Sequence, residues 1–200
     1  MKLPEEFYLN NNVVDIARNL LGKYLFTNID GVIAGGYIVE TEAYNGALDK
    51  ASHAYDNRLT PRTQTMFEQG GIAYVYLCYG IHEMFNVVTS VKGQPHAVLV
   101  RAVNPTVGID TMLYRRNMAV VKPNLTAGPG SVGKALGISR KLNGMSLQSD
   151  KLWIEDQGLT FANEEITAVP RIGVAYAAED ALLPYRFYVK GNIYVSKPNR

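Results

Sequence analysis

The chain has 200 residues, of which 47% are hydrophobic and 19% charged, and its net charge is +2. This composition is typical of a globular protein and excludes a disordered chain. The one cysteine, Cys78, excludes an internal disulfide and any iron–sulfur or zinc site that needs several cysteines. We expect one domain over residues 1–200.

Residues 1–6 lack the apolar core of a signal peptide, and no apolar run reaches the length of a membrane span. We therefore expect a cytoplasmic protein with no membrane partner. The small positive charge permits binding to nucleic acid but is no argument for it, because many basic enzymes never contact DNA.

The first elements along the chain are a helix and a pair of strands. Asn12 is a favoured N-cap residue, and residues 13–21 after it predict a short helix. Residues 23–27 and 32–44 are rich in branched and aromatic side chains and predict strands. The Asp-Gly pair at 30–31 between them is typical of a hairpin turn.

The middle of the chain predicts a hairpin, a strand and a helix. Residues 72–88 are typical of two strands that reverse at Gly80, and the apolar residues 95–103 predict another strand. Asn104-Pro105 is a common helix beginning, so we expect a helix from there to about Asn117.

The last part of the chain predicts a loop over 122–130, a short helix over 131–136, and a closing hairpin made of residues 185–189 and 192–196. No regular strand–helix alternation runs through the sequence. We therefore expect an α+β fold: a single domain with a curved, mostly antiparallel sheet, surrounding helices and a protruding β-hairpin.

Two carboxylates lie close together on the strand predicted over 32–44. Residues two apart in a strand share a face, so Ile38, Glu40, Glu42 and Tyr44 point the same way. One interpretation is a solvent-exposed edge. The other is a wet pocket in which one carboxylate acts as a general base.

His53 follows in a loop, where a lone histidine is more often structural than catalytic. No second histidine lies at metal-ligand spacing, so we expect no metal site. The sequence also lacks a phosphate-binding loop, a dinucleotide-binding fingerprint and a nucleophile elbow, and we expect no cofactor.

Three tyrosines belong to the hairpin predicted around Gly80. Tyr74 and Tyr76 share one strand face and are compatible with ordinary core packing. Tyr79 stands at the hairpin tip, where a bulky aromatic side chain is unusual. One use for it there is insertion between DNA bases, in the space left by an extruded nucleotide.

Arg101 lies inside an apolar strand, where a guanidinium is costly without an anionic partner. Its partner could be Glu42, Glu40 or a DNA phosphate.

These segments, taken in order, resemble the alkyladenine (3-methyladenine) DNA glycosylase family, in the manner of a bacterial member. The resemblance covers nearly the whole chain, from about residue 7 to residue 196. It is carried by residues 39–44 (VETEAY), His53, 60–62 (TPR), 66–67 (MF), 74–80 (YVYLCYG), Asn86, 99–102 (LVRA), 128–129 (GP) and 186–189 (RFYV).

The resemblance implies a role for each matching position. Glu42 corresponds to the general base that deprotonates the attacking water, while Arg101 and the backbone carbonyl of Ile172 hold that water. Tyr44, His53 and Tyr76 correspond to the aromatic walls that sandwich the flipped base. Asn86 corresponds to a gatekeeper against the exocyclic amine of guanine, and Tyr79 to the intercalating tyrosine.

The sequence departs from the family at a few places. Ser131 stands where members commonly carry a lysine that contacts the DNA backbone, and Lys134 follows three residues later. Ile81 replaces a methionine of a mammalian relative, and the connection over 91–96 is slightly longer than in that relative. The departure at Ser131 leaves DNA contact by this loop open.

The resemblance implies base-excision DNA repair. We expect a monofunctional N-glycosylase without lyase activity, which flips alkylated or deaminated purines such as 3-methyladenine, 7-methylguanine and hypoxanthine out of double-stranded DNA and hydrolyses them. We also expect a monomer associated with the bacterial nucleoid.

Two other functions remain open at this stage. A non-catalytic nucleic-acid-binding module of related fold would not need Glu42. A glycosidase acting on free nucleosides or sugars would have no use for Tyr79 at a hairpin tip.

Overall fold

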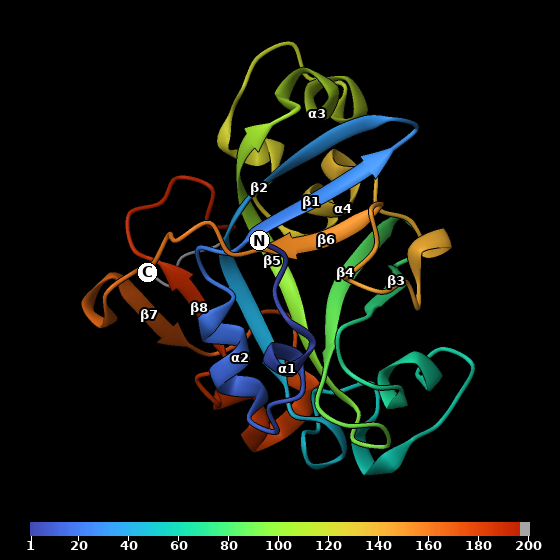
Figure 1. The fold of residues 1–200 in the computed structure, drawn as a ribbon. Coiled ribbons are helices and arrows are strands. Elements are labelled where there is room, and N and C mark those ends of the chain that lie inside the picture. Colours follow the sequence, from blue (N-terminus) through green and yellow to red (C-terminus); the bar gives the residue numbers. More distant parts are fainter. Residues whose placement is uncertain (197–200) are drawn as a thin grey trace.

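The computed structural model describes residues 1–196, and eight strands within them form one curled antiparallel sheet (Figure 1). The strands are β1 (Tyr24–Ile29), β2 (Val32–Tyr44), β3 (Ala73–Cys78), β4 (His82–Thr89), β5 (His96–Val107), β6 (Leu152–Glu155), β7 (Ile166–Val169) and β8 (Arg186–Val189). The main path runs β3-β4-β5-β2-β1-β6, and β8 joins β2 to β7. The predicted α+β class with a mostly antiparallel sheet is confirmed.

Short helices surround the sheet. The α-helices are α1 (Glu5–Tyr8), α2 (Val13–Asn19), α3 (Ile109–Arg116) and α4 (Pro129–Leu136). The 3-10 helices are η1 (Gly46–Leu48), η2 (Tyr55–Asn57), η3 (Gln64–Phe67), η4 (Pro123–Leu125), η5 (Arg140–Leu142), η6 (Asn163–Glu165) and η7 (Ala175–Leu182). Across residues 1–196, no helix combines the length and apolar character needed to cross a membrane.

The long strand β2 is the centre of the sheet and changes its partner along its length. Its first part, Val32 to Tyr37, pairs with β1, whereas Glu40 to Glu42 pair with β8. Strand β5 follows its other edge, with register shifts at two places near Glu40. Figure 1 accordingly shows β7 and β8 on one side of β2, and β3 and β4 on the other.

Helix α2 covers one face of β2 and fixes which side chains point away from it. The Asn12 side chain accepts hydrogen bonds from the backbone N–H groups of Val14 and Asp15, which confirms the predicted N-cap. Thr41 Oγ1 donates to the carbonyl of Ala17 in α2 at 2.7 Å. Because neighbouring residues of a strand point to opposite faces, Glu40 and Glu42 face away from α2.

The helix expected from Asn104 to Asn117 begins later than predicted. Asn104 and Pro105 continue β5, opposite Tyr37 and Gly36 of β2. A proline cannot donate a ladder hydrogen bond, and Pro105 lies where the register shifts, as prolines in sheets do. Gly36 permits the close approach, because a Cβ there would lie 2.0 Å from the Asn104 carbonyl oxygen.

The closing hairpin expected from residues 185–189 and 192–196 does not form. Strand β8 pairs with β7 and with β2, and residues 192–196 form turns. The backbone N–H of Ser196 instead donates to Glu40 Oε2 at 2.6 Å. Ser196, which the local pattern places in the second strand of a hairpin, thus binds a buried carboxylate of β2. Strands β6 and β7 were not predicted.

The protruding hairpin is confirmed. Strands β3 and β4 pair in register from Ala73–Val87 to Cys78–His82. Tyr79 and Gly80 form the turn, both with positive φ (50° and 73°). The Tyr79 side chain is 89% exposed at the tip, as the sequence predicts.

Candidate active site

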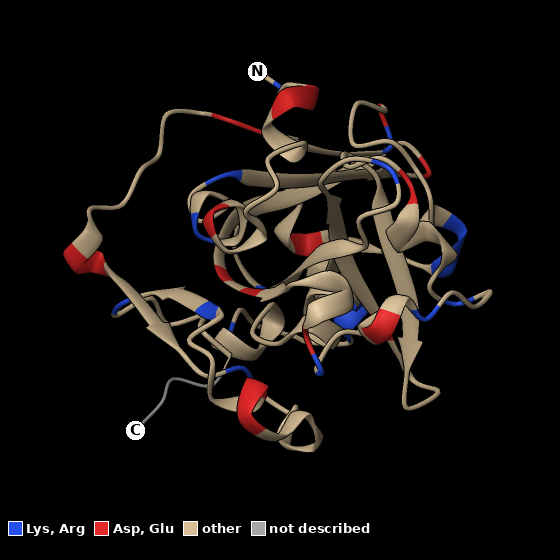
Figure 2. Cartoon of the chain, turned by 90° about the horizontal axis from the view of Figure 1, so that it is seen from below, with Lys and Arg blue, Asp and Glu red and all other residues tan. Residues whose placement is uncertain are grey.

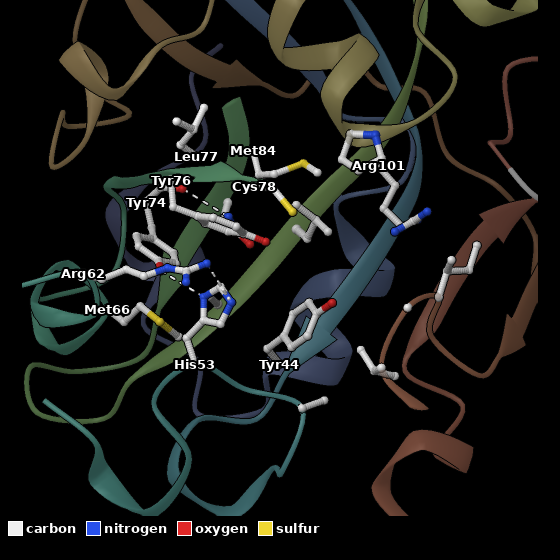
Figure 3. Close-up of a pocket in the computed structure, with 18 of the residues that line it drawn as sticks. Tyr44, His53, Arg62, Met66, Tyr74, Tyr76, Leu77, Cys78, Met84 and Arg101 are labelled. Carbon is white, nitrogen blue, oxygen red and sulfur yellow. Dashed lines mark hydrogen bonds between the residues drawn. The ribbon is translucent and has the colours of Figure 1, made fainter. Parts of the chain in front are cut away.

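A pocket of about 500 Å³ opens between β2, β3, β5 and the loops that follow β2 and β7. Figure 3 shows Tyr44 and Arg101 on one side of it, and Tyr76, Tyr74, His53 and Arg62 on the other. Its lining is made of Tyr44, Ala51, His53, Arg62, Met66, Tyr74, Tyr76, Leu77, Cys78, Tyr79, Met84, Asn86, Ala97, Leu99, Arg101, Pro129, Ile172, Gly173, Val174 and Tyr176.

The predicted aromatic residues converge on this pocket. The His53 ring lies 4.7 Å from the Tyr76 ring, and the Tyr74 and Tyr76 rings are 5.3 Å apart. Tyr44 comes from the end of β2 and lines the other side. Asn86 on β4 is buried in the lining, with its side-chain amide donating to the Tyr74 carbonyl at 3.2 Å. A flat, apolar guest with a few polar edges fits such a site.

His53 is held in its neutral form. Burial and the nearby Arg62 guanidinium lower its pKa to about 4. Arg62 Nη2 lies 3.2 Å from His53 Nε2 and can only donate, so Nε2 accepts. Nδ1 therefore carries the proton and donates to the Tyr74 hydroxyl, 3.0 Å away. The Arg62 guanidinium also lies 4.8 Å from the centre of the Tyr76 ring.

Glu42 lies directly behind the pocket wall. It is fully buried and does not itself line the pocket, whereas three of its partners do. Its Oε1 accepts the backbone N–H of Ile172 at 2.8 Å. Its Oε2 accepts the Tyr44 hydroxyl at 2.9 Å and lies 3.2 Å from Arg101 Nη1. Burial and the charge of Glu42 raise the pKa of Tyr44, so its hydroxyl remains a donor.

Glu40 is also fully buried, and two arginines share it. Arg101 Nε and Arg186 Nε each donate to Glu40 Oε1 at 2.9 Å. Burial acts to lower the pKa of Arg101, but the carboxylates of Glu42 and Glu40 outweigh it and raise that pKa. Arg101 therefore bridges the two carboxylates, and the interpretation of this strand face as a solvent-exposed edge is wrong.

Three arginines near the site have no role predicted from the sequence, although Arg62 and Arg186 lie in segments that carry the family resemblance. Arg186 lies at the start of an apolar strand, which is the signal that singled out Arg101 and could have found it too. Arg62 belongs to a segment that carries the family resemblance, although no role was attached to it. Arg171 is buried against Asp49 beside the site, and no local pattern of the sequence points to it.

Charges of both signs are interspersed around the described chain (Figure 2). Beside the pocket, however, Lys50, Arg58 and Arg62 line a second cavity of about 430 Å³. Lys50 Nζ is paired with Glu179 at 2.5 Å and is not among the lining residues of the first pocket. Within residues 1–196, no group of three or more His, Cys, Asp or Glu side chains could hold a metal ion.

The chain is similar to a known family over most of its length. The sequence profile of the family described as methylpurine-DNA glycosylase matches residues 6–193. A Chlamydia felis protein is 47% identical over 197 residues, 98% of each chain, and a Bacillus cytotoxicus protein is 45% identical over 98% of this chain and 100% of its own. Both are provisionally named as 3-methyladenine DNA glycosylases.

The shared carboxylate leads to a prediction about stability. Replacing Glu40 by Gln removes the charge that Arg101 and Arg186 share in the interior. Breaking a buried ion pair in this way should lower the free energy of unfolding by about 3–5 kcal/mol. Urea denaturation checks this, with the exposed ion-pair variant Asp150→Asn as a control that should stay close to the native protein. A Glu40→Gln protein of native stability would contradict it.

Proposed function

The chain belongs to the methylpurine-DNA glycosylase family, and from that premise we propose that it flips alkylated or deaminated purines out of duplex DNA and hydrolyses their N-glycosidic bond. Membership makes it a hydrolase of DNA repair. The observation that carries the finer proposal is a buried carboxylate, Glu42, whose three neighbours line an aromatic pocket.

The pocket suits a flipped purine. Tyr44 lies across the cavity from His53 and Tyr76, so a planar base can lie between aromatic side chains (Figure 3). A positively charged alkylated base gains roughly 0.5–2 kcal/mol from each good aromatic contact. A damaged or mismatched base also costs less to unstack, which adds selectivity before the chemical step.

Glu42 can serve as the general base. A carboxylate has about four lone-pair positions, and the Ile172 N–H, Tyr44 and Arg101 account for three of them. One position is left for a water between Glu42 and the sugar. Glu42 takes a proton from this water as its oxygen bonds to the anomeric carbon, and the purine leaves with the electrons of the broken bond.

The neighbours of Glu42 complete the proposed role. Arg101 lines the pocket and contacts the Glu42 carboxylate, so it can bind the water together with the Ile172 carbonyl. The negative charge of Glu42 stabilises the oxocarbenium character that develops on the sugar. Asn86 lies deep in the lining, where its amide would meet an edge of the base and disfavour the exocyclic amine of guanine.

Replacing Glu42 by Gln should lower the single-turnover rate of base release roughly 10²- to 10⁴-fold, the usual contribution of a general base. Gln keeps the size of the side chain, so affinity for a duplex carrying one hypoxanthine should be retained. Gel-shift binding and product release on the same duplex measure both quantities. Glu155→Gln, on the remote strand β6, is the control. Equal, measurable rates before and after the Glu42 change would refute its role as general base, and binding without base release by either protein would favour the non-catalytic binding module.

Tyr79 is proposed to fill the gap left by the extruded nucleotide. Replacing it by Ala removes base stacking worth about 1–3 kcal/mol, so excision from duplex DNA should slow roughly 5- to 150-fold. Tyr114 is a matched control, because its side chain is 87% exposed on helix α3, away from the hairpin. If Tyr79→Ala and Tyr114→Ala excise hypoxanthine equally fast, the insertion role is wrong.

The reaction is proposed to stop at base removal. Strand cleavage by a lyase would need an amine that forms a Schiff base with the sugar. No lysine is found among the lining residues of the described pocket, and Lys50 beside it is engaged by Glu179. Borohydride treatment during the reaction should therefore leave no covalent protein–DNA adduct on a denaturing gel, and a trapped adduct would refute the monofunctional scheme.

A further inference from the structure

Arg171 forms a buried, two-pronged ion pair beside the site. Its Nη1 donates to Asp49 Oδ2 at 2.5 Å and its Nη2 to Asp49 Oδ1 at 2.8 Å. Both side chains are essentially inaccessible to solvent, and neither lines the pocket. A planar guanidinium bound in this way is fixed in position and in orientation.

The Arg171 guanidinium packs against the ring of Tyr44. It lies 4.9 Å from the centre of the Tyr44 ring and 5.3 Å from that of Tyr185. It also donates to the carbonyls of Ala43 at 2.8 Å and Asp180 at 3.1 Å. The end of β2 and η7 are therefore joined through one side chain.

Asp49 extends this junction to the loop after β2. Its Oδ2 accepts the backbone N–H of Asn45 at 3.0 Å, and its Oδ1 accepts that of Ala51 at 2.9 Å. Each Asp49 oxygen thus accepts one backbone N–H of the loop and one guanidinium N–H of Arg171. His53, in the opposite wall of the pocket, follows two residues after Ala51.

Both uncharged donors to Glu42 depend on this junction. One is the hydroxyl of Tyr44, whose ring lies against the Arg171 guanidinium. The other is the backbone N–H of Ile172, the residue that follows Arg171. The two donors bind different oxygens of the carboxylate and so restrict its rotation.

We infer that the Arg171–Asp49 pair is the positioning element of this site: it holds the Tyr44 hydroxyl and the Ile172 N–H on Glu42, and thereby aims the free lone pair of that carboxylate at the pocket. The inference rests on the function proposed above. A buried ion pair is weak evidence for stability, since apolar side chains of similar volume often do as well. The planar, two-pronged geometry of this pair suits it to hold two donors in fixed positions on a third residue.

Three variants test the pair. Arg171→Gln removes the charge and the fork, and Arg171→Lys keeps the charge but loses the planar fork. Asp49→Asn keeps Arg171 and weakens its ion pair. This variant replaces Arg171→Gln in the test if Arg171→Gln does not fold. Leu152→Ala is the control, because Leu152 is a fully buried core residue on the remote strand β6. This substitution should lower the stability of the protein without changing the site.

Thermal unfolding, affinity for a hypoxanthine duplex and single-turnover base release are measured for each variant. We expect base release to fall roughly 10- to 100-fold in Arg171→Gln and in Arg171→Lys, because small displacements of catalytic groups have effects of this size. Affinity should stay close to that of the native protein. Adding Tyr44→Phe to Arg171→Gln should slow release by less than the product of the two single effects, since both changes act on the same donor.

Four outcomes would overturn the inference. The first is base release in Arg171→Gln as fast as in Leu152→Ala, and the second is a native rate of base release in Arg171→Lys. The third is that the rate losses caused by Arg171→Gln and Tyr44→Phe simply multiply in the double variant. The fourth is a loss of DNA affinity as large as the loss of rate. Any of the first three would leave the pair a structural ion pair, and the last would make it a DNA-binding element.

A crystal structure of the Arg171→Gln protein separates this inference from the proposed function. We expect the Ile172 N–Glu42 Oε1 contact of 2.8 Å to be broken and the Tyr44 ring to be displaced. Unchanged contacts would overturn the positioning role even if the native protein excises hypoxanthine. If the native protein releases no base from any lesion duplex, the proposed function fails while this structural result still decides whether Arg171 positions Glu42.

Discussion

Two buried carboxylates on one face of β2 are the constraint on which the site depends. Glu40 and Glu42 are both inaccessible to solvent. Burying two such charges is costly unless cations and hydrogen-bond donors surround them. Arg101 lies between them and contacts both. The other partners differ between the two carboxylates. Arg186 and the Ser196 N–H bind Glu40, whereas Tyr44 and the Ile172 N–H bind Glu42.

This division separates stability from chemistry. The described partners of Glu40 come from β5, β8 and the segment after β8, so it ties the sheet together and leaves Arg101 oriented toward its neighbour. Glu42 has partners that line the pocket, and this placement is what supports its proposed role as the general base. Tyr44 belongs to both parts, because its hydroxyl binds Glu42 while its ring lines the pocket. In the function proposed above, recognition of a base and activation of water are thus joined in one side chain.

Cations on the aromatic walls set the character of the pocket. Arg62 lies over Tyr76 and Arg171 over Tyr44, while burial and the Arg62 guanidinium together lower the pKa of His53 and keep it neutral with Nδ1 protonated. In the proposed function, rings that pack against guanidinium groups lose less conformational entropy when a base binds between them. Tyr79 also contributes to the pocket lining, from the exposed tip of the hairpin.

The sequence by itself determined features with a local cause. The period of two in a strand put Glu40, Glu42 and Tyr44 on one face, Asn12 capped its helix, and the turn at Gly80 left Tyr79 at a tip. Whether that face was exposed or buried depended on β8 and on residue 172, more than a hundred residues away in the chain. Asn104-Pro105 resembles a helix beginning, yet pairing with Gly36 keeps it in a strand. Residues 192–196 form no strand and Ser196 binds Glu40, while Arg171 reaches Asp49, because these contacts join segments that no window of sequence contains together.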